Sequence, residues 1–118
     1  MTPALRSQFT AASQAAYARS VAATNQFAKL YMAQGVNHCG GGPGAQSFIA
    51  NPNYGELTQA LENWVENGVA PESIPITKQA NNSATGATQF TTLLCSYPTS
   101  LTYLGSGDLL SASSYVCR

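Results

Sequence analysis

The stretch that most constrains the fold is YMAQGVNHCGGGPGAQSF, residues 31–48. It holds the only histidine of the chain, His38, and directly after it Cys39. Glycines stand on both sides of this pair, at positions 35, 40, 41, 42 and 44. Glycine adopts positive φ angles at no steric cost and lets another group approach the backbone closely. We therefore predict an irregular, glycine-rich loop that carries a single imidazole.

Working outward, the segments before and directly after this loop predict two helices and a strand. The alanine-rich residues 10–24 favour a helix with only a weak apolar face. The short apolar run FAKLYMA, residues 27–33, predicts a buried strand that leads into the loop. Residues 53–68 place apolar side chains at helical spacing and end at Gly68, which is typical of an amphipathic helix with a glycine C-cap. Asn53 and Glu56 have the spacing of a capping box.

The second half of the chain predicts extended segments separated by turns. ESIPITKQA, residues 72–80, reads as an extended segment that carries two isoleucines. Residues 80–89 are rich in Asn, Ser, Thr and Gly and predict a surface loop. This loop contains a glycosylation sequon at 81–83, which has meaning only in a secreted protein. The tail mixes short apolar runs with turn signals, so it predicts no long element.

The composition limits the possible functions. The chain has 118 residues, enough for one small domain, and no net charge. Only 8% of its residues are charged, far below the usual ~25%, so we expect part of its surface to be covered by something else. No basic stripe suits nucleic acid, and no polybasic patch or apolar run of ~20 residues suits a membrane. The first residues lack the pattern of a signal peptide.

Three cysteines cannot all pair within one chain, so at least one is free or has its partner elsewhere. The best internal pair is Cys95 with Cys117. In the chain-entropy model, closing a loop of roughly 22 residues stabilises the fold by about 3 kcal/mol. This pairing leaves Cys39, the neighbour of His38, as the odd cysteine.

Four roles for His38 compete. A catalytic pair with Cys39 is disfavoured, because adjacent side chains in an extended or loop segment point in different directions. A Cys₃His zinc site has the right number of ligands, but the cysteines lack the close spacing of such sites. The third role is an ordinary loop histidine. The fourth is a general base whose partners lie elsewhere, and the order strand, histidine loop, helix matches that of α/β-hydrolases.

Three blocks of sequence resemble the tannase and feruloyl esterase family. LYMAQGVNHCGGGPG, residues 30–44, is similar to the family's Gly-x-x-His-Cys-x-Gly-Gly segment. LENWVENGVAPESI, residues 61–74, is similar to its Leu-x-x-Trp-Val-Glu-x-Gly-x-Ala-Pro helix. LLCSYPTSLTYLGSGDLLSASSYVC, residues 93–117, is similar to its Leu-Cys-Pro-Tyr-Pro…Tyr-x-Gly-Ser-Gly…Cys tail. The blocks occur in order and cover roughly residues 27–118.

The resemblance implies an α/β fold in which residues 1–118 form the C-terminal part of an α/β-hydrolase catalytic domain. This part would comprise the last strand, the catalytic-histidine loop, the following helix and a tail stapled by a disulfide. His38 would be the triad histidine, and Cys39 would pair with a cysteine next to the nucleophilic serine. Cys95 and Cys117 would form a second disulfide. The family's Cys-Ser-x-Gly-Gly nucleophile segment, its upstream triad acid and its calcium-binding lid have no counterpart in this sequence.

The implied function is carboxylic ester hydrolysis on esters of aromatic acids, such as galloyl or feruloyl esters. We expect the isolated chain to be inactive, without a cofactor of its own, and to need the missing N-terminal part of the same enzyme. The full-length enzyme is expected to be secreted and to hold calcium in its lid. The alternative is a small standalone secreted binding or structural protein stapled by Cys95–Cys117. Cys39 would then be free or bridge two chains.

Overall fold

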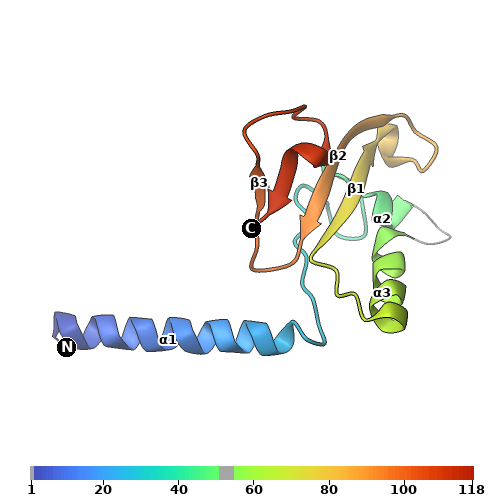
Figure 1. Cartoon of the computed structure of the whole chain (residues 1–118). Coiled ribbons are helices and arrows are strands. Elements are labelled where there is room, and N and C mark those ends of the chain that lie inside the picture. Colours follow the sequence, from blue (N-terminus) through green and yellow to red (C-terminus); the bar gives the residue numbers. More distant parts are fainter. Residues whose placement is uncertain (1, 51–54) are drawn as a thin grey trace.

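The computed structural model describes residues 2–50 and 55–118, and its central element is an antiparallel hairpin (Figure 1). The hairpin consists of β1, Ser73–Gln79, and β2, Thr88–Cys95. Alternate residues of β1 are buried, with Ile74 opposite Leu94 in the register. The extended segment predicted over 72–80 is thereby confirmed, because the period-two pattern buries its isoleucines on one face.

Two helices lie against β1: α2, Ser47–Ala50, and α3, Glu56–Asn67 (Figure 1). The amphipathic helix predicted over 53–68 is confirmed for α3. It ends at Gly68, which has φ 69° and donates its N–H to the carbonyl of Trp64. The predicted capping box is wrong: the N-cap is Gly55, with no side-chain cap. Asn53 lies outside the described residues.

A second antiparallel pair joins β3, Leu101–Tyr103, to β4, Tyr115–Cys117. Two short 3₁₀ helices complete the fold: η1, Ala80–Asn82, and η2, Ala112–Ser114. All strand pairs among the described residues are antiparallel. This part of the chain therefore combines helices and strands without a parallel sheet of its own.

The hydrophobic core is small. Among the residues whose burial is described, it consists of four, Ala45, Ile74, Ile76 and Leu94. The apolar stripe of α3 is only partly covered, since Leu61 is 57% and Val65 is 77% exposed. Exposed apolar side chains on a helix this amphipathic indicate a face that a larger assembly would cover.

The first helix, α1, extends away from the rest of the fold (Figure 1). It runs over Pro3–Thr24, so the helix predicted from residue 10 is confirmed and begins earlier. Among its described side chains only Val21 is even partly buried. The radius of gyration is 17.7 Å, against about 13–14 Å for a compact chain of this length. The hydroxyl of Tyr17 contacts that of Tyr97, but no side chain described in α1 is buried. A helix with so little packing is marginal in water even when rich in alanine, so α1 needs a surface to pack on.

The strand predicted over 27–33 is wrong. The structure shows an irregular segment in which only Tyr31 forms an isolated bridge, to Ser96. Phe27 is 78%, Leu30 is 55% and Met32 is 66% exposed, so the segment is not buried either. A strand needs a neighbour along its whole edge, and among the described residues the backbone of this segment pairs with another extended stretch only directly after β2, at Ser96 and Tyr97.

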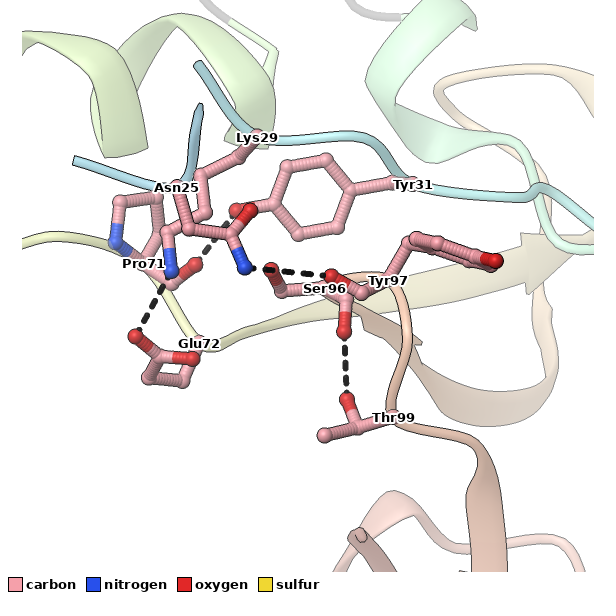
Figure 2. A network of polar contacts seen from close by, with 8 residues as sticks. All are labelled: Asn25, Lys29, Tyr31, Pro71, Glu72, Ser96, Tyr97 and Thr99. Carbon is pink, nitrogen blue, oxygen red and sulfur yellow. Dashed lines mark hydrogen bonds and ion pairs between the residues drawn. The ribbon is translucent and has the colours of Figure 1, made fainter. Parts of the chain in front are cut away.

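Polar contacts tie this segment to the two ends of the hairpin (Figure 2). Lys29 forms an ion pair with Glu72 at 2.8 Å, and the Tyr31 hydroxyl donates to the carbonyl of Pro71 at 2.5 Å. The N–H of Tyr97 donates to the carbonyl of Leu30 at 2.8 Å. Burial, and after it the negative charge of Glu72, raise the pKa of Tyr31 above its usual value. These contacts fix where the chain enters the histidine loop.

For two buried serines, Ser96 and Ser47, we predict that substitution by alanine has opposite effects on the free energy of unfolding. The Ser96 hydroxyl, in a residue 2% exposed, has no hydrogen-bond partner among the described residues, so Ser96→Ala should raise the free energy of unfolding by about 1 kcal/mol. The Ser47 hydroxyl accepts from the Thr77 N–H at 2.9 Å and donates to Glu56 at 2.5 Å. Ser47→Ala should therefore lower the free energy of unfolding by about 1–2 kcal/mol.

Urea denaturation of both variants, fitted with a common slope, measures this difference. Each variant serves as the control of the other, because the same atom is deleted at two buried positions. A loss of stability in Ser96→Ala would contradict the assignment of its hydroxyl as unpartnered.

Candidate active site

The histidine loop is closed by backbone hydrogen bonds at its base and near its tip. At the base, the N–H of Gly44 donates to the carbonyl of Gly35 at 2.8 Å. Nearer the tip, the N–H of Asn37 donates to the carbonyl of Gly41 at 3.1 Å. The predicted irregular loop is confirmed, with positive φ at Gly35, Gly40, Gly41 and Gly42.

Two glycines allow the two sides of the loop to pack backbone against backbone. A Cβ atom at Gly44 would lie 2.1 Å from the carbonyl oxygen of Gln34. A Cβ atom at Gly42 would lie 2.4 Å from the carbonyl oxygen of Gly35. Any side chain at these positions would open the base of the loop, so close approach requires both glycines, and Gly42, with φ 87°, is also required by its backbone conformation.

His38 and Cys39 are the two central residues of a tight turn at the tip. The turn is closed by the N–H of Gly40, which donates to the carbonyl of Asn37 at 3.1 Å. Cys39 has φ 63°, a left-handed conformation that is uncommon for a residue with a side chain. Both side chains are exposed. The turn therefore presents the imidazole to the surroundings.

The structure brings the two neighbouring side chains together, which corrects the expectation that they point apart. Cys39 Sγ lies 3.1 Å from His38 Nδ1. The argument from adjacent side chains in a loop is wrong here, because the left-handed backbone of Cys39 turns the chain and brings Sγ back toward the imidazole. Within residues 2–50 and 55–118, the imidazole has no hydrogen bond to a hydroxyl or a carboxylate.

The other two cysteines lie elsewhere in the fold. Cys95, at the end of β2, and Cys117, in β4, form a disulfide with a Cα–Cα distance of 5.4 Å. Cys39 is free and exposed. The predicted pairing is confirmed, and it leaves no Cys₃His set. No three His, Cys, Asp or Glu side chains of the described part of the chain gather as a metal site.

Beneath the loop lie two buried polar residues that sequence reasoning missed. Gln46 is 4% and Lys78 is 8% exposed, and both bond to the glycines that follow the turn. Lys78 follows Ile74 and Ile76 at a spacing of two, so the alternation in β1 could have placed it on the buried face. No pattern in the sequence marks Gln46.

A cleft of about 420 Å³ lies beside the base of the loop and along β2. Met32, Gln34, Gly44, Thr92 and Leu101 are among the residues that line it, but His38 is not. The cleft and the imidazole are therefore separate features.

Among the helices of residues 2–50 and 55–118, none combines the length and the apolar character that a membrane span requires.

Comparison with known proteins shows that this chain is similar to one part of several longer esterases and hydrolases. A family model described as tannase and feruloyl esterase matches residues 4–118. An uncharacterized esterase of Xanthomonas campestris is 35% identical over 106 residues, which cover 83% of this chain and 18% of the esterase. A mono(2-hydroxyethyl) terephthalate hydrolase of Piscinibacter sakaiensis is 35% identical over 91 residues, which cover 77% of this chain and 14% of the hydrolase.

A solved structure agrees with these matches. The crystal structure of an esterase from Aspergillus oryzae superposes with a TM-score of 0.67 at 29% sequence identity. The superposition covers 90% of this chain and 24% of the esterase. The chain spans less than a fifth of the length of the two curated relatives, so the rest of their structure has no counterpart in it.

Proposed function

Because this chain belongs to the tannase and feruloyl esterase family, we propose that it is the C-terminal part of an α/β-hydrolase catalytic domain with His38 as general base. The single observation that carries the proposal is the turn at the loop tip, which exposes the only imidazole of the chain on a backbone closed by hydrogen bonds. An exposed, positioned imidazole with no hydroxyl bound to it suits a role toward a serine on another segment.

The proposed reaction is a two-step acyl transfer. His38 takes the proton of the serine hydroxyl as the serine attacks the ester carbonyl, and then gives that proton to the leaving alcohol. An acyl-serine remains. In the second step His38 takes a proton from water as the water oxygen attacks the acyl carbonyl, and it returns that proton to the serine oxygen as the acid leaves.

Cys39 is proposed to form a disulfide with a cysteine next to that serine. Its free thiol and exposed position support this role, since it lies at the outermost point of the turn. Such a bond would hold the histidine and serine loops together. It would also draw Sγ away from His38 Nδ1, the atom that a triad carboxylate binds.

The remaining part of the enzyme is the proposed partner of this chain. That part of the enzyme would cover exposed surface of this chain. The surface includes the apolar residues Phe27, Leu30 and Met32 and most of α1. The proposed substrates are esters of aromatic acids. Calcium is proposed only for the lid of the complete enzyme, because the described residues offer no metal site, and no step involves it. The disulfide Cys95–Cys117 supports secretion of the complete enzyme.

A chimera tests the proposal. This chain replaces the matched segment of the Piscinibacter hydrolase, and release of terephthalate from mono(2-hydroxyethyl) terephthalate is measured. We expect the chimera to turn over the ester, and the isolated chain and the hydrolase lacking the segment to be inactive, because neither contains both the nucleophilic serine and the triad histidine. Two results would contradict the proposal. One is a folded but inactive chimera, and the other is ester hydrolysis by the isolated chain that is lost in His38→Ala.

A further inference from the structure

The Gln46 side chain holds the histidine loop from inside the fold. Its Oε1 accepts from the N–H of Gly41 at 2.7 Å, and its Nε2 donates to the carbonyl of Gly41 at 3.1 Å. A primary amide has the same donor and acceptor as a peptide group, so one side chain satisfies both polar groups of Gly41. The carbonyl of Gly41 also accepts from the N–H of Asn37. A chain of hydrogen bonds therefore runs from Gln46 through Gly41 to the residue before His38.

Lys78 holds the next residue of the loop from β1. Its Nζ donates to the carbonyl of Gly42 at 3.0 Å and contacts Asn82 Oδ1. No carboxylate of the described residues lies within 4 Å of this buried ammonium group. A buried charge with only neutral acceptors costs stability relative to an apolar side chain. The buried position of Lys78 is better explained by its hydrogen bond to the carbonyl of Gly42 than by a contribution to the stability of the core.

We propose that Gln46 and Lys78 are positioning residues for His38. The inference rests on the proposed function, because positioning matters only if His38 acts on a substrate. A loop with several glycines at positive φ has large conformational freedom, and general-base catalysis requires the imidazole within about 2.6–3.2 Å of the hydroxyl. The two buried side chains restrict the residues directly after the turn. They act through the backbone of Gly41 and Gly42 and do not touch the imidazole.

The first test uses this chain alone and does not depend on catalysis. Gln46→Leu and Lys78→Met remove the polar groups and retain most of the side-chain volume. Hydrogen exchange by NMR should show the Gly41 amide exchanging at least tenfold faster in Gln46→Leu, and the Gly40 amide severalfold faster in both variants. Amides in the β1–β2 ladder should stay within twofold of the parent chain. Unchanged protection in the loop, or an equal loss everywhere, would overturn the inference.

Gln79→Leu is the matched control. The amide of Gln79 also bonds a backbone carbonyl, that of Ala84 at 3.0 Å, but this bond lies in the loop between β1 and β2. The control removes an amide–carbonyl bond of the same kind without touching the histidine loop. In Gln79→Leu, the amide hydrogens of Gly40 and Gly41 should exchange at the same rate as in the parent chain.

The second test uses the chimera with the Piscinibacter hydrolase. In both variants kcat should fall at least tenfold while KM stays within twofold, because a misplaced base weakens the chemical step and leaves substrate contacts intact. Gln79→Leu should leave both constants unchanged. A loosened loop with unchanged kcat would overturn the positioning role. An inactive parent chimera would instead refute the proposed function, and the exchange experiment would still decide whether the two residues hold the loop.

Discussion

In the chimera, replacing His38 by alanine is expected to lower kcat by about 10⁴- to 10⁶-fold. Without the imidazole, no group takes the proton of the serine hydroxyl, and the neutral hydroxyl is a poor nucleophile. The change should leave the fold intact, because His38 is exposed and its only hydrogen-bond partner in the described part of the chain is Cys39. Initial rates of terephthalate release, with circular dichroism as a check on folding, measure the effect.

Gln89→Ala provides the control for this prediction. Gln89 is exposed near the start of β2 and is not part of the histidine loop, so its loss should change kcat by less than twofold. If His38→Ala lost no more activity than Gln89→Ala, the residue would be an ordinary loop histidine. The assignment of the family would stand, and the general base would lie elsewhere in the enzyme.

The second large effect is expected from removal of the Cys95–Cys117 disulfide. The bond joins the end of β2 to β4 across a sequence separation of 22 residues. Replacing both cysteines by alanine should lower the free energy of unfolding by about 3 kcal/mol, because the unfolded chain gains the freedom of the opened loop. For a chain with so small a buried core, this is a large fraction of the stability.

Urea denaturation and a thiol count measure this effect. Both the parent chain and the double variant should contain one free thiol, that of Cys39. Cys39→Ser is the matched control, since it removes an exposed sulfur that closes no loop. It should change the free energy of unfolding by less than about 0.5 kcal/mol. Equal losses in the control and in the double variant would contradict the predicted role of the disulfide.

The sequence predicted part of the geometry around His38, and the reason differs from residue to residue. Close spacing in the sequence placed His38 and Cys39 in one loop, but it did not predict their contact. The contact depends on the φ of Cys39, which the closure of the turn imposes. Gln46 acts through backbone atoms five residues earlier in the chain, and such contacts leave no trace in side-chain patterns.

The sequence by itself determined the elements whose pattern is local: the alanine-rich helix, α3 with its Gly68 cap, and the alternation that buries Ile74 and Ile76. It also determined the pairing of the cysteines and the family. Tertiary structure alone decided that residues 27–33 form no strand, because a strand depends on a neighbour distant in sequence. It also decided which buried groups hold the loop, since hydrogen bonds between β1 and the glycines exist only after the chain has folded.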